Sequence, residues 1–195
     1  MCPVCGALER HRLVWLFLER RTDLFDGRPR RILHVGPEPC LEARLRQTPS
    51  FDYLSADLDN PSAMVRIDIT DIPYADKYFD FIHCSHVLEH VVNDRRAMSE
   101  LRRVLADDGW AILQVPIGSA HTLEDPTVTD PKDRERVFGQ SDHVRIYGPD
   151  YFDRLEAAGF SVERVAGHEF VSEEEAQRIS VDLEEVIPVC RRAGS

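Results

Sequence analysis

Two aspartates follow a glycine turn at spacings that suggest one shared ligand. Gly36 ends a short apolar run, and Asp57 closes the next predicted strand 21 residues later. An acid about 20 residues past such a turn can accept hydrogen bonds from both hydroxyls of a ribose. Asp68 ends a further strand, where a carboxylate can accept a hydrogen bond from an exocyclic amine while Ile69 lies against the ring. The joint spacing predicts an adenosine-bearing cofactor.

Histidines gather near the same predicted edge of the sheet. His86 and His90 lie one helical turn apart and flank Glu89, and His143 lies near the end of a long irregular segment. One hypothesis makes His86 or His143 a general base, with His90 beside it, because histidine titrates near neutral pH. A second makes His86, Glu89 and His90 divalent-metal ligands together with His121 or His143. A third gives Glu89 and His90 only hydrogen bonds at a helix start. We predict catalytic roles for His86, His143 and His90, and no bound metal.

The cysteines supply only part of a metal site. Cys2 and Cys5 form a Cys-Pro-Val-Cys-Gly motif, which is half of a zinc ribbon, whereas a tetrahedral site usually takes two such pairs and the sequence has no second pair. We therefore expect a metal-free N-terminal segment, with zinc shared between two chains as the alternative. Cys40 and Cys84, both at predicted strand ends, are expected to be small packing residues.

Length and charge exclude several classes of protein. At roughly 150 residues per domain, 195 residues predict one domain. No apolar run approaches the roughly 20 residues that span a bilayer. A formal net charge of −11 disfavours binding to phosphate backbones, so a nucleic-acid partner is not expected. An odd number of cysteines and an N-terminus without a secretory pattern predict a reducing cytoplasm.

The elements that must position these residues alternate between strands and helices. Residues 1–28 are expected to form the cysteine motif and a helix (Ala7–Arg21) that packs on the main domain, residues 29–195. Asp107–Gly109 is predicted as a turn, and the polar residues 117–147 as a lid. The alternation predicts an α/β fold with a mainly parallel sheet covered by helices on both faces. The predicted strands are 31–36, 51–57, 64–68, 78–84, 110–115, 160–166 and 185–191; the other predicted helices are 41–47, 87–92, 94–105, 149–158 and 173–178.

The stretch from Asp68 to Val92, which ends in Val-Leu-Glu-His-Val, resembles the class I S-adenosylmethionine-dependent methyltransferases of the group called type 11. Arg102–Leu113 is similar to the turn and fifth strand of that family, and the resemblance covers about residues 30–166. It implies a Rossmann-like three-layer α/β/α sandwich, a seven-stranded mostly parallel sheet with a C-terminal antiparallel hairpin, and methyl transfer from the cofactor sulfonium. The Cys2–Arg12 segment resembles the second half of a zinc ribbon found in relatives. The expected cofactor-binding residues are Gly36, Glu38, Asp57, Leu58, Asp68, Ile69, Cys84 and Ser85.

The chain departs from this family at the glycine-rich turn. His34 replaces the usual acid, only Gly36 is kept, and Glu38 and Cys40 replace later glycines. A diphosphate needs close backbone approach at those glycines, whereas S-adenosylmethionine has no phosphate and carries an ammonium group. One hypothesis therefore directs Glu38 toward the methionine end of the cofactor. The alternative places Glu38 only in the first turn of the next helix, where the helix dipole favours acids.

Three classes of function follow from these residues. The first is a methyltransferase for a small-molecule acceptor held under the 117–147 lid, with oxygen slightly favoured over nitrogen because a base is at hand. A metal-assisted O-methyltransferase is a variant of it. The second is a module that binds the cofactor without catalysis, and the third is a nucleotide-dependent oxidoreductase, which the missing glycines disfavour. A homo-oligomer is compatible with all three.

Overall fold

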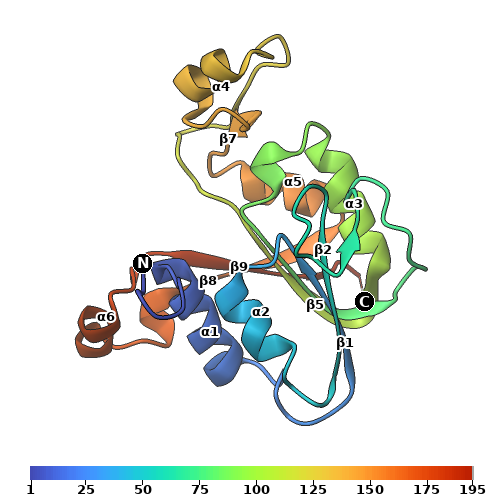
Figure 1. Ribbon diagram of the computed structural model, residues 1–195, viewed down its shortest axis with the longest axis vertical. Coiled ribbons are helices and arrows are strands. Elements are labelled where there is room, and N and C mark those ends of the chain that lie inside the picture. Colours follow the sequence, from blue (N-terminus) through green and yellow to red (C-terminus); the bar gives the residue numbers. More distant parts are fainter. Residues whose placement is uncertain (195) are drawn as a thin grey trace.

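A computed structural model describes residues 1–194, and a seven-stranded sheet forms its centre (Figure 1). The strand order is β3-β2-β1-β4-β5-β9-β8. Strands β1 to β5 pair in parallel, whereas β9 runs antiparallel to both β5 and β8. The predicted mostly parallel sheet with a final antiparallel hairpin is confirmed. The strands are β1 (Arg30–Val35), β2 (Phe51–Asp57), β3 (Val65–Arg66), β4 (Phe79–Ser85), β5 (Leu105–Gln114), β8 (Phe160–Ala166) and β9 (Val186–Arg192).

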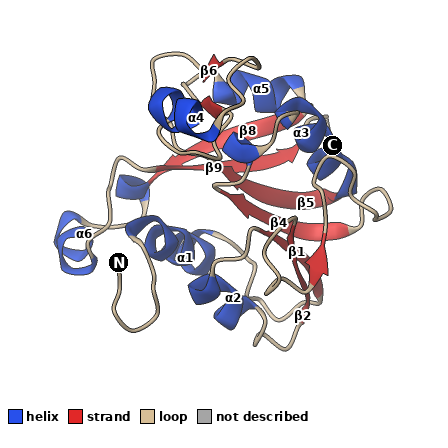
Figure 2. Cartoon of the chain, turned by 45° about the horizontal axis from the view of Figure 1, so that its top comes forward, coloured by secondary structure: helices blue, strands red, loops and turns tan. Residues whose placement is uncertain are grey.

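Helices cover both faces of the sheet, which makes the three layers (Figure 2). On one face, α1 and α2 bury an apolar cluster with Phe81 and Trp110 of the strands. On the other, α3 and α5 bury a second cluster around Met98 and Tyr151. Within residues 1–194, no helix is long and apolar enough to span a membrane. The helices are α1 (Glu9–Arg21), α2 (Pro39–Leu45), α3 (Asp94–Val104), α4 (Pro131–Phe138), α5 (Tyr151–Ala157) and α6 (Glu173–Ile179), with short 3₁₀ turns at η1 (Leu88–His90) and η2 (Gly167–Glu169).

Local signals fix several of these boundaries. In α1, Leu13, Val14, Phe17 and Leu18 recur at helical spacing and are all buried. α3 begins after Asn93, whose side chain accepts a hydrogen bond from the amide of Arg96, as an N-cap residue does. The central strand β4 is buried along nearly its whole length, as expected for a parallel strand covered by helices on both faces.

The predicted turn at Asp107–Gly109 is wrong, because these residues belong to β5. Phe79 of β4 pairs with Leu105, but Phe81 pairs with Trp110, so β5 accommodates its extra residues in a bulge. A Cβ atom at Gly109 would lie 3.0 Å from the carbonyl oxygen of Asp80. The Asp-Asp-Gly sequence therefore marks a close approach of two strands rather than the end of one.

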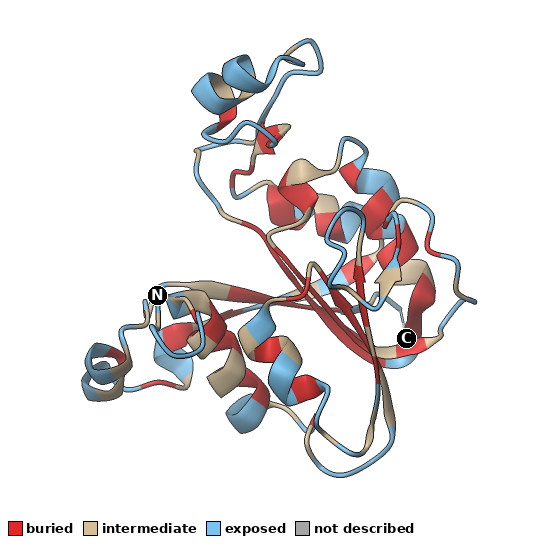
Figure 3. Cartoon of the chain, in the orientation of Figure 1, coloured by how far each residue is buried: buried red, intermediate tan, exposed pale blue. Residues whose placement is uncertain are grey.

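Residues 117–147 hold more regular structure than predicted. They contain β6 (Leu123–Glu124), α4 and β7 (Arg145–Ile146), and β6 pairs with β7. The helix signals were present in the sequence: Asp130 caps α4 with its side chain, Pro131 occupies the first turn, and Gly139 ends the helix with φ +86°. Figure 3 shows α4 as mostly exposed, away from the sheet.

Candidate active site

The carboxyl ends of β1, β2 and β4 meet at a cavity of about 760 Å³, which we call the strand-end cavity. The chain leaves β1 toward β2 on one side and returns to β4 on the other, so the cavity lies where the strand order reverses, as ligand sites in such sheets do. The structure brings most of the predicted site residues to this cavity. They are Gly36, Asp57, Leu58, Asp68, Ile69, Ser85, His86 and His90.

The Asp57 carboxylate is held rigidly at the end of β2. Its Oδ1 accepts hydrogen bonds from the backbone amides of Asp59 and Asn60, each at 2.8 Å. Among the described residues these bonds leave Oδ2 available to a ligand. A preoriented carboxylate of this kind can accept charge-assisted hydrogen bonds from a pair of hydroxyls.

Asp68 and Ile69 form a polar and an apolar part of the same wall. Oδ1 of Asp68 accepts hydrogen bonds from the amide and the hydroxyl of Thr70, each at 2.8 Å. The Asp68 side chain is otherwise exposed, whereas Ile69 is buried. The pair can therefore offer an acceptor to an amine and an apolar surface to a ring.

Gly36 lets the backbone approach the floor of the strand-end cavity. Its φ is +62°, and a Cβ atom there would lie 2.7 Å from Cγ2 of Val87. Both the left-handed backbone and the contact exclude a side chain.

We expect Gly36→Ala to weaken binding of S-adenosylhomocysteine, a nucleoside probe for this cavity, by about tenfold. A left-handed alanine costs about 1–2 kcal/mol, and the contact with Val87 adds to this cost, so the loop relaxes away from its present form. Titration calorimetry measures the affinity. Gly139→Ala is the matched control, since Gly139 is also left-handed but a Cβ there meets nothing within 4 Å. Equal affinities in Gly36→Ala and the parent chain would contradict the prediction.

His86 is fixed by three constraints. Its backbone is left-handed, with φ 55°, which is rare for a residue with a side chain and is typical of functional sites. Its amide donates to the carbonyl oxygen of Gln114 at 2.9 Å. Its Nδ1 lies 3.3 Å from Oε1 of Glu89, a carboxylate that is 1% exposed. The Nε2 atom is left for a ligand.

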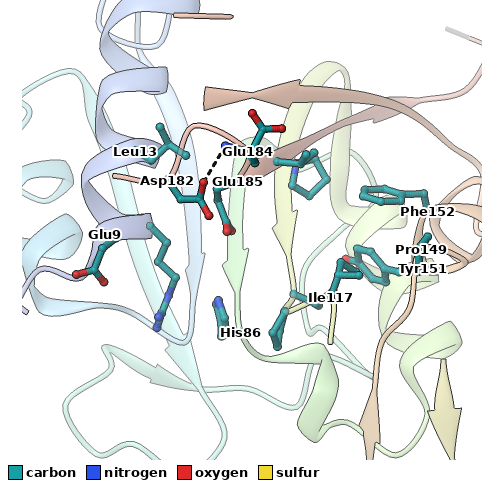
Figure 4. A pocket seen from close by; sticks show the side chains of 15 residues that line it. Glu9, Leu13, His86, Ile117, Pro149, Tyr151, Phe152, Asp182, Glu184 and Glu185 are labelled. Carbon is teal, nitrogen blue, oxygen red and sulfur yellow. Dashed lines mark hydrogen bonds between the residues drawn. The ribbon is translucent and has the colours of Figure 1, made fainter. Parts of the chain in front are cut away.

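A second cavity, of about 690 Å³, opens on the other side of His86, and we call it the α1 cavity. Figure 4 shows Glu9 and Leu13 of α1 on one side of it, Tyr151 and Phe152 on the other, and His86 between them. His86 lines both cavities. Further carboxylates come from the segment before β9, namely Asp182, Glu184 and Glu185.

Two predicted cofactor residues do not line the strand-end cavity. Glu38 turns toward the α1 face of the sheet, where its Oε2 lies 2.8 Å from Nε2 of His34. Glu38 precedes α2 as its N-cap residue, and its carboxylate contacts this buried histidine. A role for Glu38 at the methionine end of the cofactor stays a prediction. Cys84 is 1% exposed and packs inside the sheet, and burial raises the pKa of its thiol.

His143 reaches the site only through His90. The two rings lie 4.6 Å apart between centroids, and His90 Nδ1 lies 3.2 Å from a carboxylate oxygen of Asp142. Burial lowers the pKa of His143, and the nearby His90 lowers it further, so the ring stays neutral at pH 7. Glu89, His90 and His143 have potential metal-ligand atoms within 4.8 Å of one another; neither His86 nor the exposed His121 belongs to that group.

The segment 117–147, predicted as a lid, contributes one residue to each cavity. Of its residues, Ile117 lines the α1 cavity and Asp142 lines the strand-end cavity. The α1 cavity was missed in the sequence because its walls come from segments far apart in the chain: residues 9–13, His86, and residues 115–117, 149–152 and 182–188. No local pattern indicates that these segments meet.

Comparison with known proteins agrees with this geometry. Residues 42–113 match a family model described as a methyltransferase domain. Similar solved structures include the 1,6-didemethyltoxoflavin-N1-methyltransferase of Burkholderia thailandensis with bound 1,6-didemethyltoxoflavin and S-adenosylhomocysteine (14% identity, TM-score 0.60, covering 95% of this chain and 78% of that one). An S-adenosylmethionine-dependent methyltransferase of Mesorhizobium loti matches with 16% identity and TM-score 0.60, covering 95% and 99%. A proposed methyltransferase of Bacillus halodurans matches with 19% identity and TM-score 0.54, covering 91% and 93%. No curated protein matches the chain.

These matches confirm the Rossmann-like α/β/α fold. The residues that match the methyltransferase-domain model include β2, β4 and most of β5. The comparisons also support S-adenosylmethionine as the predicted cofactor.

Proposed function

We propose that the protein is an S-adenosylmethionine-dependent methyltransferase that acts on a hydroxyl group of a small molecule. The observation that carries this proposal is His86, which lies between a cavity with nucleoside-binding features and a second cavity large enough for an acceptor. The net charge of −11 favours a small molecule over nucleic acid as the acceptor. All five cysteines are free, in keeping with the predicted cytoplasmic location.

The residues of the strand-end cavity suit a nucleoside with a sulfonium group better than a dinucleotide. Asp57 would bind the ribose hydroxyls, and Asp68 with Ile69 would bind the adenine ring. Gly36 is followed by Pro37, which has no amide hydrogen to offer a phosphate. The loop therefore lacks the row of glycine amides with which dinucleotide sites bind a diphosphate.

S-adenosylmethionine, when bound, supplies a methyl group on a positively charged sulfur and becomes S-adenosylhomocysteine. The α1 cavity would hold the acceptor against Tyr151 and Phe152, so that its hydroxyl oxygen lies in line with the methyl group. Oε1 of Glu89 lies 3.3 Å from Nδ1 of His86. This carboxylate would favour the tautomer with a proton on Nδ1 and a lone pair on Nε2, which would take the hydroxyl proton. The proton lost by the acceptor thus moves to His86 as the carbon–oxygen bond forms.

Asp57→Asn tests cofactor binding. Asparagine retains an oxygen to accept the amides of Asp59 and Asn60 but loses the charge offered to the ribose, so we expect affinity for S-adenosylhomocysteine to fall about 10–100-fold. This range corresponds to the roughly 1.5–3 kcal/mol of a hydrogen bond to a charged group. Calorimetry with the parent chain, Asp57→Asn and the exposed control Asp52→Asn on the same strand measures it. Tight binding of NAD with no binding of S-adenosylhomocysteine would reject the proposed function.

A metal-assisted methyl transfer is the second candidate, because Glu89, His90 and His143 can approach one ion. In that case a chelator would abolish turnover, and added divalent metal would restore it. Unchanged turnover after chelation would leave His86 as the base.

A further inference from the structure

Three ionisable side chains meet inside the protein, on the face of the sheet covered by α1 and α2. His34 comes from β1, His83 from the neighbouring strand β4, and Glu38 from the residue before α2. Their side chains are 0%, 1% and 13% exposed. Nε2 of His34 lies 2.8 Å from Oε2 of Glu38, and Nε2 of His83 lies 3.5 Å from the same oxygen. We call these residues the buried histidine cluster.

The cluster leaves polar atoms without partners. Among the described residues, neither ring nitrogen of His83 makes a hydrogen bond, nor does Oε1 of Glu38. Nε2 of His11, from α1, is also buried and without a hydrogen bond, 3.7 Å from that Oε1. Buried polar side chains in native proteins nearly always have a partner, so several such atoms around one carboxylate indicate a missing ligand.

The positions of the donor atoms match a metal ion. One ligand atom from each of His34, Glu38 and His83 lies within 4.8 Å of the others. Zinc bonds of about 2.0–2.1 Å in a tetrahedron place neighbouring ligand atoms roughly 3.3 Å apart. The distances from Oε2 of Glu38 to Nε2 of His34 and to Nε2 of His83, 2.8 Å and 3.5 Å, lie on either side of that value.

The surroundings of His34 also match those of a metal-binding histidine. Metal-binding histidines usually donate the other ring N–H to a polar group, which fixes the ring. Nδ1 of His34 lies 2.9 Å from the hydroxyl of Tyr53, which can serve as that acceptor. Two imidazoles and one carboxylate form a common ligand set for Zn²⁺.

We propose that His34, Glu38 and His83 bind one Zn²⁺ ion, with the fourth position facing His11. The ion joins β1, β4 and the residue before α2, directly behind the loop that begins at Gly36. The site is separate from the strand-end cavity, because none of its ligands lines that cavity. The role that we propose for the ion is therefore structural.

Metal analysis of the intact purified chain gives the first test. We expect about one equivalent of zinc that survives dialysis, and an X-ray absorption spectrum with nitrogen and oxygen donors but no sulfur. Removal of the ion with a chelator is expected to lower the thermal midpoint, and added zinc to restore it. Less than a tenth of an equivalent, even after incubation with excess zinc, would overturn the proposal, and so would sulfur donors, since none of the three proposed ligands contains sulfur.

Variants locate the ion without relying on activity. His83→Gln and Glu38→Gln are expected to lower zinc affinity at least 100-fold in competition with a chelating dye. His168→Gln, at an exposed histidine, is the control and is expected to retain it. The double variant Cys2→Ser/Cys5→Ser is also expected to retain zinc. Should His83→Gln not fold, Glu38→Gln gives the same test, because Glu38 belongs only to the buried histidine cluster. Zinc lost from His90→Gln but retained by His83→Gln would place it at the other histidine group and overturn the proposal.

Discussion

His86→Asn is expected to lower kcat for methyl transfer by about 10²–10⁴-fold, the range that a positioned general base contributes. Asparagine adopts the left-handed backbone of His86 more readily than most residues, so the fold of the loop is retained. It offers no ring nitrogen to take a proton from an acceptor. The measurement is transfer of a labelled methyl group to small-molecule hydroxyl acceptors that the parent protein methylates.

Cofactor affinity distinguishes the loss of a general base from a loss of the structure of the site. We expect binding of S-adenosylhomocysteine to His86→Asn to stay within about threefold of the parent chain, a change of less than 1 kcal/mol. His168→Asn, at an exposed position, serves as the control and is expected to keep full turnover. If His86→Asn turned over at the parent rate, proton transfer by His86 would be wrong, and positioning of the acceptor alone would explain catalysis.

Arg145→Met is expected to destabilise the fold by about 3–5 kcal/mol, the usual cost of removing one partner from a buried ion-pair network. Arg145 is 4% exposed and donates to the carbonyl oxygens of Leu88 and Val92, each at 2.9 Å, and to the carboxylate of Glu124 at 3.0 Å. Asp94, also 4% exposed, lies 3.8 Å from it. Methionine fills much of the volume but leaves these acceptors unpaired. Equilibrium urea unfolding measures the difference.

An exposed arginine provides the comparison. Arg136 pairs with Asp133 on α4, but the two side chains are 74% and 54% exposed. Arg136→Met is expected to change the free energy of unfolding by less than about 0.5 kcal/mol, since exposed ion pairs contribute little. A loss below 1 kcal/mol in Arg145→Met would show that water reaches the carbonyl groups that Arg145 now binds.

The sequence predicted the parts of the site that depend on strand ends. β2 and β8 have the predicted bounds, and Asp57 lies at the end of β2, where the spacing from Gly36 had placed it. Such positions follow from local pattern, because a buried strand in a parallel sheet ends at a defined edge. The predicted cofactor-binding residues that line the strand-end cavity are those whose position depends on the backbone alone.

The rest depends on contacts between distant segments. The Glu38 carboxylate points toward His34 and His83, which lie on two different strands. The residues next to Glu38 in the sequence do not indicate that it contacts either histidine. The same is true of the α1 cavity, where Glu9 and Glu185 lie on opposite ends of the chain. A sequence pattern reports the face of an element but not the partner that the face meets.

The position of β9 has a consequence for biosynthesis. β9 follows every other strand of the described residues 1–194, yet it lies between β5 and β8, and within these residues β8 pairs with β9 alone. On the ribosome, residues 160–166 therefore have no strand to pair with in the sheet until residues 186–192 have emerged from the exit tunnel. Nascent chains stalled before that point are expected to expose an unpaired edge at β5 and to recruit chaperones.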